Sequence, residues 1–276
     1  MMTTGPAWIP PDVDLTVPSV ARVYDYYLGG AHNFDVDRVF AEKVLEGFPE
    51  ARDFARHNRR FLQRAVRTTV TELGVIQFLD LGAGIPTAGP THQTARDVDP
   101  AARTLYVDND LVAVSHTTLI LQRDRIPATE VAVLHADLRR VDDVLESPQA
   151  QAVLDFDQPV AVMILGLLHF LSDQDNPAGL LARYLDALPA GSCLIASHAT
   201  GDGPVGERIR RAADQYAETT LPAHVRSKAT FEAMVTPLVE LVEPGVTWTA
   251  LWRPDEHVDP LVAPYCVAYA TVGVKR

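Results

Sequence analysis

Residues 75–87 read VIQFLDLGAGIPT, and this stretch decides the fold. The apolar run 75–81 is typical of a buried β-strand, and it is followed at once by a turn that contains two glycines. In open α/β sheets such a turn lies at the carboxyl edge, where ligands bind. Glycine permits positive φ angles and lets a ligand approach the backbone, while amides at the start of the following helix can hold a carboxylate. We therefore predict a ligand site at residues 82–84.

Apolar runs and stretches of helical character alternate along the chain on both sides of this loop. A long amphipathic helix is predicted over 49–73, with Gly74 at its C-terminal cap. Another helix is expected between an Asn176 cap, with Pro177 in its first turn, and the Pro189 to Gly191 stop. This alternation is typical of a parallel sheet with covering helices. The expected parallel strands are 75–81, 104–108, 130–135, 159–165 and 191–197, followed by a helix at 204–219 and a closing hairpin of 246–253 and 263–274.

The composition limits the classes of function. The chain has 276 residues, 47% of them hydrophobic, and a net charge of −12, which argues against nucleic acid as the main partner because that binding depends on lysine and arginine. Cys193 and Cys266 lie in apolar stretches and are expected to be reduced core residues. No metal motif, membrane-spanning run or signal pattern is present in the sequence, so we expect a cytoplasmic protein without a metal site and without a membrane or nucleic-acid partner. The oligomeric state cannot be inferred.

Two common nucleotide-binding loops are excluded by particular residues. A dinucleotide fingerprint requires a third glycine where Thr87 stands, and a phosphate loop requires a GK[ST] sequence that the chain lacks. Acidic residues at the next two strand ends indicate an adenosine site instead. Asp108 stands where a ribose diol is bound, and Asp137 can accept a hydrogen bond from an adenine amino group.

These residues, taken in order, resemble the class I S-adenosylmethionine-dependent methyltransferases. A closer resemblance, to an actinobacterial group once classed as a domain of unknown function, rests on Pro18 to Gly30 (PSVARVYDYYLGG), Asn33-Phe34, Asp37-Arg38, the loop ending Gly84 to Thr87, and Asp108-Asn109-Asp110. The resemblance implies S-adenosylmethionine as the cofactor and a Rossmann-like, seven-stranded, mostly parallel sheet with an antiparallel last strand, helices on both faces and an N-terminal helical lid. Leu111 stands where many relatives have proline.

The resemblance also assigns roles to individual residues. Asp80 and the loop Gly82, Ala83 and Gly84 would hold the methionine part of the cofactor, and Asp108 would hold the ribose. Asn109 would contact one face of the adenine, and Asp137 with Leu138 its edge. Gly166, at the end of the fourth strand, is a further candidate for cofactor binding. The expected organisation is an extended arm at 1–17, a helical cover at 18–73 and a methyltransferase core at 74–276, all in a single domain.

Candidate catalytic and lid residues each carry two interpretations. His169 and His198, at the ends of the fourth and fifth strands, are candidate bases, or they are hydrogen-bonded structural residues. An aromatic segment that includes Tyr24, Tyr27, Asn33 and Phe34 would form a lid that contacts substrate, or would pack the first helix against the sheet. A stripe of arginines between residues 52 and 67 is a solvated face paired with acids, or the binding surface of an acidic partner.

Three functions compete on this evidence. The first is a methyltransferase that acts on a small molecule, with oxygen slightly favoured over nitrogen as the acceptor. The second is a non-catalytic or regulatory protein that binds S-adenosylmethionine. The third, a nicotinamide-dependent oxidoreductase, is disfavoured by Thr87.

Overall fold

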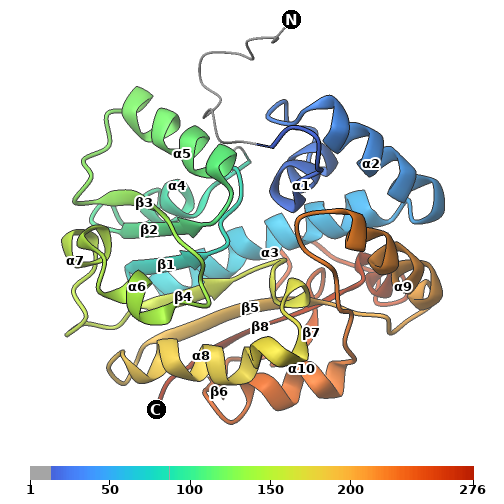
Figure 1. Ribbon diagram of the computed structural model, residues 1–276. Helices are drawn as coiled ribbons and strands as arrows, with labels where there is room; N and C mark the ends of the chain where they lie inside the picture. Colours follow the sequence, from blue (N-terminus) through green and yellow to red (C-terminus); the bar gives the residue numbers. More distant parts are fainter. Residues whose placement is uncertain (1–13, 87) are drawn as a thin grey trace, which may run out of the picture.

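One sheet of eight strands forms the centre of the protein (Figure 1), in the computed structural model, which describes residues 14–86 and 88–276. Its strand order is β3-β2-β1-β4-β5-β8-β6, and β7 pairs with β8. The first five strands are parallel, and β8 runs antiparallel to β5, β6 and β7. The strands are β1 (Gln77–Leu81), β2 (Arg103–Asp108), β3 (Val131–His135), β4 (Ala161–Ile164), β5 (Cys193–Ala199), β6 (Glu240–Leu241), β7 (Thr247–Trp248) and β8 (Ala268–Val274).

Helices cover both faces of this sheet. Alternate side chains along each strand point to opposite faces, and they pack into two separate hydrophobic cores. Leu79, Leu105 and Val162 face α6, α7, α8 and α10, whereas Phe78, Ala161 and Met163 face α3 and α4. The two-sided burial accounts for the continuous apolar runs in the strand sequences. The covering helices are α3 (Ala51–Thr71), α4 (Thr91–Arg96), α5 (Leu111–Arg123), α6 (Val141–Leu145), α7 (Pro148–Val153), α8 (Pro177–Asp186) and α10 (Lys228–Val235).

A third group of helices packs beside the carboxyl ends of the parallel strands. It consists of α1 (Val20–Tyr27), α2 (Asp35–Gly47), the start of α3 and α9 (Gly206–Gln215), which share one apolar core. Figure 1 shows the blue α1 and α2 next to the orange α9, although more than half of the chain separates them in sequence. The short 3-10 helix Tyr216–Glu218 ends α9, and residues 219–227 then run back to α10. Residues 1–13, most of the predicted N-terminal arm, lie outside the described residues.

The predicted class, the five parallel strands and the long helix before β1 are confirmed. The helix predicted over 49–73 spans 51–71, and Gly74 follows it with φ +69°. The Asn176 cap is also confirmed, since its Oδ1 accepts a hydrogen bond from Gly179 N at 3.2 Å. The closing hairpin is shorter than predicted, and the sheet has eight strands rather than seven. Both cysteines are free and buried.

The strand expected over 246–253 contains only Thr247–Trp248 because the chain turns immediately afterwards. Leu251 N and Trp252 N both donate to Trp248 O, at 2.8 Å and 3.1 Å. The turn buries the Trp252 ring against Phe61 of α3, with centroids 5.3 Å apart. Arg64 holds it in place by donating to Thr249 O and Trp252 O at 2.6 Å and 2.8 Å. Burial of the apolar part of the indole ring against α3 stabilises the turn.

Candidate functional site

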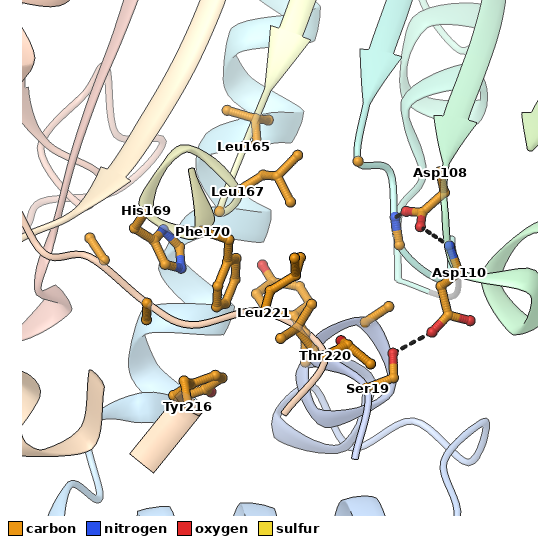
Figure 2. A pocket seen from close by; sticks show the side chains of 18 of the residues that line it. Ser19, Asp108, Asp110, Leu165, Leu167, His169, Phe170, Tyr216, Thr220 and Leu221 are labelled. Carbon is orange, nitrogen blue, oxygen red and sulfur yellow. Dashed lines mark hydrogen bonds between the residues drawn. The ribbon is translucent and has the colours of Figure 1, made fainter. Parts of the chain in front are cut away.

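A cavity of about 500 Å³ lies at the carboxyl ends of β1, β2, β3 and β4, beneath α1, α9 and the segment that follows α9. The predicted cofactor residues lie together in its wall because parallel strands end at one edge of the sheet. All nine line it: Asp80, Gly82, Ala83, Gly84, Asp108, Asn109, Asp137, Leu138 and Gly166. Figure 2 shows Asp108 on one side of the pocket and His169, Phe170 and Tyr216 on the other. Among the described residues no group of three or more His, Cys, Asp or Glu is arranged to hold a metal ion.

The glycine loop is fixed by backbone bonds to the neighbouring strand. Gly82 N and Ala83 N donate to Val107 O at 2.8 Å and 3.3 Å, and Gly84 N donates to Asp108 Oδ2 at 2.7 Å. Gly82 and Gly84 have φ of +68° and +63°, and a Cβ at Gly84 would meet open space, so a ligand can approach the backbone there. All three amides donate hydrogen bonds to acceptors within the protein, and the next helix, α4, begins only at Thr91. The contact between a ligand carboxylate and amides of the next helix therefore stays a prediction.

Asp108 is almost completely buried at the end of β2. Its Oδ1 accepts from Asp110 N at 2.8 Å and its Oδ2 accepts from Gly84 N, which fixes the carboxylate against the glycine loop. Burial raises the pKa of Asp108 to about 6, and the two backbone hydrogen bonds oppose that shift. At neutral pH the group is therefore predominantly ionised, with lone pairs left over for the hydroxyls of a ligand.

Opposite charges meet at the β1 end of the cavity. Burial raises the pKa of Asp80 to about 6, and the hydrogen bond from Thr91 Oγ1 to Asp80 Oδ2, at 2.6 Å, opposes this together with the positive charge of Arg59. Arg59 comes from α3 and also lines the cavity, with its guanidinium 5.9 Å from the centre of the Tyr24 ring. Its buried Nε has no hydrogen-bond partner among the described residues. Sequence reasoning placed Arg59 only in the arginine stripe and missed this position.

The β3 end of the cavity is polar and already partly paired. Arg139 donates to both carboxylate oxygens of Asp137, with Nη2 to Oδ2 at 2.7 Å, and this pairing lowers the pKa of Asp137. Leu138 O accepts from Tyr184 Oη at 2.7 Å, which ties the loop to α8. Asn109 is exposed, and its carbonyl lies 3.2 Å from His135 Nε2.

A buried hydrogen-bond network holds the β4 end against α3. Gly166 N donates to Ser197 Oγ at 2.8 Å, Ser197 Oγ donates to Asn58 Oδ1 at 2.6 Å, and Asn58 Nδ2 donates to Tyr24 Oη at 3.1 Å. Gly166 has φ +64°, and a Cβ there would press against the Asn58 amide. The network makes Asn58 a further residue of the site that sequence analysis missed. It also shows that Tyr24 both lines the cavity and packs the first helix.

The N-terminal cover is joined to the β2 end through Asp110. Ser19 Oγ donates to Asp110 Oδ2 (Figure 2), while Asp110 Oδ1 caps α5 by accepting from Val112 N at 2.7 Å. Arg22 of α1 lies 3.9 Å from the same carboxylate. This contact places α1 over the cavity opening, where Tyr24 and Tyr27 line the wall.

Two of the predicted lid residues have other contacts. Asn33 Nδ2 donates to Asp25 Oδ2 at 2.9 Å and to Gly30 O at 3.0 Å. Phe34 lies below the Arg22 guanidinium, 5.3 Å from its carbon, and packs near Ile85. Neither is among the described residues that line the cavity.

His169 lies in the 3-10 turn Leu168–Phe170 after β4 and lines the cavity. It is 6% exposed, its ring packs edge-on against Phe54 at 5.7 Å, and its Nδ1 has no hydrogen-bond partner among the described residues. Burial lowers the pKa of His169 well below the usual value, helped by the positive charges of neighbouring groups. The imidazole is therefore neutral at physiological pH and able to accept a proton.

His198 faces away from the cavity and does not line it. Its Nδ1 is 2.6 Å from Ala199 O, and its Nε2 is 3.1 Å from Arg226 Nη1, so both ring nitrogens have partners within the protein. Arg226 also donates to Leu168 O at 3.3 Å and Leu171 O at 2.8 Å, which fixes the turn that carries His169. The structural interpretation of His198 therefore fits its contacts, and its effect on the site passes through Arg226.

Because His198 is buried, we expect it to make the free energy of unfolding depend on pH, and His198→Gln should remove this contribution. Burial lowers its pKa to about 4. Because the unfolded side chain titrates near pH 6.5, its contribution is fully present above that pH and is lost as the pH falls toward 4. Urea unfolding at pH 7 and pH 4.5 should show a decrease in unfolding free energy that is smaller in His198→Gln, by up to about 3 kcal/mol. The exposed control His257→Gln should keep the wild-type decrease, and an equal decrease in both variants would contradict the assignment.

The other arginines of the stripe have mixed partners. Arg52 pairs with Glu42 at 3.1 Å, Arg56 with Asp53 at 3.6 Å and Arg67 with Asp255 at 3.1 Å, so these contacts favour a solvated, locally paired face. Arg64 and Arg59 differ from them, since one holds the turn after β7 and the other reaches the cavity.

Comparisons with known proteins identify the family of the chain. The family model described as S-adenosyl methyltransferase matches residues 6–276. The structure of a candidate methyltransferase from Thermobifida fusca YX has 37% identity and a TM-score of 0.88, covering 98% of this chain and 100% of that one. A DUF574-family protein from Streptomyces avermitilis has 32% identity and a TM-score of 0.88, covering 94% of this chain and 98% of that one.

A more distant relative shows the fold alone. It is the magnesium protoporphyrin IX methyltransferase of Synechocystis PCC 6803 with bound S-adenosylhomocysteine, at 11% identity and a TM-score of 0.53, covering 92% of this chain and 93% of that one. No curated protein is similar enough to match the chain. No helix in the described ranges is long and apolar enough to cross a bilayer. Because the family model and two relatives above 30% identity extend over almost the whole chain, it belongs to the S-adenosyl methyltransferase family, and it is an S-adenosylmethionine-dependent methyltransferase.

Proposed function

We propose that this enzyme transfers the methyl group to an oxygen atom of a small molecule, with His169 as the general base. The observation that carries the proposal is a neutral imidazole in the wall of the cavity, whose buried Nδ1 has no hydrogen-bond partner among the described residues. A hydroxyl acceptor must lose its proton during transfer, and a positioned base accelerates such a step. The bound cofactor supplies an electrophilic methyl group, and the protein supplies position and a proton acceptor.

The charges around the cavity support the proposed position of the cofactor. An amino-acid group carries one positive and one negative charge, and the β1 end presents Asp80 and Arg59, which have the opposite signs. Asp80 would accept from the ammonium group, and the guanidinium of Arg59, which also lines the cavity, would donate to the carboxylate. Asp108 would accept the ribose hydroxyls, and the Asp137 to Leu138 turn would border the adenine.

The role of Arg59 can be tested by removing its charge. We expect Arg59→Met to weaken S-adenosylhomocysteine binding by about 10- to 100-fold, since a hydrogen bond to a charged group contributes about 1.5–3 kcal/mol. Binding of 5′-methylthioadenosine, which lacks the amino-acid group, should stay within twofold. Calorimetry measures both affinities, and the exposed neighbour Arg60→Met is the matched control. An equal loss for both ligands would exclude a specific contact with the carboxylate.

Methyl transfer itself is tested by offering acceptors to the purified enzyme with S-adenosylmethionine. S-Adenosylhomocysteine should form when the small-molecule fraction of a cell extract is added, and it should not form with the macromolecular fraction. Formation only with macromolecules would overturn the proposed acceptor class. Cofactor binding without product from the small-molecule fraction would likewise contradict the proposed acceptor class.

A further inference from the structure

The charged residues of the cavity are concentrated at the cofactor end. Asp80 and Arg59 lie at the β1 end, Asp108 and Asp110 at the β2 end, and Asp137 with Arg139 at the β3 end. Two further charged residues line the cavity: Arg22, which lies 3.9 Å from Asp110, and Asp14, on which the positive charge of Arg22 acts. Among the described residues that line the cavity, His169 is the one histidine, and its imidazole is neutral at physiological pH.

Most of the remaining wall is apolar, and it comes from five parts of the chain. It combines α1, the α2–α3 corner, the turn after β4, α9 and residues 220–225. Representative side chains are Tyr27, Val44, Phe48, Leu171, Ile209 and Leu221. An ion bound in this compartment would lose its hydration without gaining a partner, which costs several kcal/mol. The compartment therefore selects against charged acceptors.

A continuous row of rings forms one side of this compartment. It runs from Tyr24 through Phe54, His169 and Phe170 to Tyr216, with successive centroids 6.5, 5.7, 4.3 and 5.6 Å apart. All five rings line the cavity, and Figure 2 shows Phe170 between His169 and Tyr216. Edge and face contacts with such a row favour a flat aromatic ligand over a saturated ring of similar size.

The far end of the row offers hydrogen bonds without charge. Tyr216 Oη donates to Tyr27 Oη at 3.4 Å, a long contact that leaves capacity for a third group. Burial raises the pKa of Tyr216 to about 12 and that of Tyr27 further, so both hydroxyls stay protonated at physiological pH. They suit a second neutral hydroxyl or carbonyl on the acceptor.

From these observations we infer that the acceptor is an uncharged aromatic compound that is methylated on a phenolic hydroxyl. The inference rests on the proposed O-methyl transfer. The phenolic oxygen forms a bond to the methyl carbon, the carbon–sulfur bond breaks with its electron pair going to sulfur, and the phenolic proton passes to the His169 imidazole. A phenol ionises near pH 10, whereas water ionises near pH 15.7, so an imidazole of low basicity takes a phenolic proton far more readily than that of an ordinary hydroxyl.

A matched set of ligands tests the acceptor class on protein saturated with S-adenosylhomocysteine. Calorimetry should detect binding of 2-naphthol, and binding at least tenfold weaker for 2-naphthoate, for 2-(aminomethyl)naphthalene and for saturated 2-decalol. With S-adenosylmethionine, mass spectrometry should detect 2-methoxynaphthalene. Equal binding of the anion, the cation or the saturated alcohol would overturn the inference.

Replacing either of two alanines by glutamate tests whether the aromatic acceptor binds in this compartment. Ala213 of α9 lines the compartment, whereas Ala217 is exposed and lies outside the described lining. Ala213→Glu should weaken 2-naphthol binding at least tenfold and leave S-adenosylhomocysteine affinity within twofold, and Ala217→Glu should change neither. Unchanged naphthol binding in Ala213→Glu would show that the aromatic acceptor does not occupy this compartment.

The two proposals fail in different ways. If 2-naphthol binds with the expected selectivity but no acceptor yields S-adenosylhomocysteine, the proposed transfer fails and the assignment of the compartment stands. If the small-molecule extract yields S-adenosylhomocysteine but the naphthol set binds without selectivity, the transfer stands and the aromatic acceptor class fails.

Discussion

Asp108→Asn should reduce affinity for S-adenosylhomocysteine by more than about 100-fold. In the native site one carboxylate oxygen accepts from Gly84 N and the other from Asp110 N. An asparagine side chain must turn its NH₂ group toward one of these N–H groups, so two donors face each other and one backbone amide loses its partner. The unsatisfied amide costs about 1–3 kcal/mol, and the lost charge-assisted bonds to the ribose cost at least as much again.

Calorimetry with S-adenosylhomocysteine measures the effect of Asp108→Asn directly. The matched control is Asp143→Asn, because Asp143 is 64% exposed on α6 and pairs only with Arg140 among the described residues. Thermal unfolding without ligand shows whether Asp108→Asn is still folded. Retained affinity within threefold would show that Asp108 orders the loop without contacting the cofactor.

His169→Ala should lower kcat by about 10²- to 10⁴-fold, the usual contribution of a positioned base. The affinity for S-adenosylhomocysteine should change by less than threefold, because the cofactor contacts are expected at the strand ends. Since burial lowers the pKa of His169 well below its usual value, the base stays deprotonated at neutral pH. The acid limb of the wild-type kcat profile, measured with saturating S-adenosylmethionine so that Asp80 and Asp108 stay ionised, should therefore lie well below pH 6.5. Initial rates with 2-naphthol, measured across pH, test both points.

Added imidazole separates a chemical role of His169 from a packing role. The Ala variant leaves space beside Phe54 and Phe170, and free imidazole should restore part of its rate. The exposed control His257→Ala should keep the wild-type rate and show no response to imidazole. A kcat within threefold of wild type in His169→Ala would leave His169 only the role of a packed ring.

The strand-end part of the site was predictable because it depends on local sequence and one topological rule. Asp80, Asp108 and Asp137 each follow an apolar run, and parallel strands bring such ends to one edge. The register then places Asp80 opposite Tyr106 in β2. No knowledge of side-chain packing is needed for this step.

The helical contributions were not predictable in the same way. Arg59 belongs to a stripe of similar arginines on α3, and only the docking of that helix on the sheet decides which guanidinium enters the cavity. His198 illustrates a second limit. β5 is buried on both faces, so its composition does not reveal that Ser197 faces α3 whereas His198 faces Phe231 of α10. Asn33 and Phe34 were predicted at the lid, and their contacts with Asp25 and Arg22 depend on how the Gly29 to Gly30 turn closes.

The cavity is covered from two sides, and a backbone hydrogen bond from Thr220 N to Pro18 O at 3.2 Å joins the two covering segments. Lys43 of α2 pairs with Glu218 at 2.8 Å and reinforces the same junction. We expect segments joined in this way to move together, so that the cofactor end and the apolar compartment open to solvent at the same time. We therefore expect the methylated product and the spent nucleoside to depart in the same event, with no compulsory order, and solvent viscosity to slow steady-state turnover.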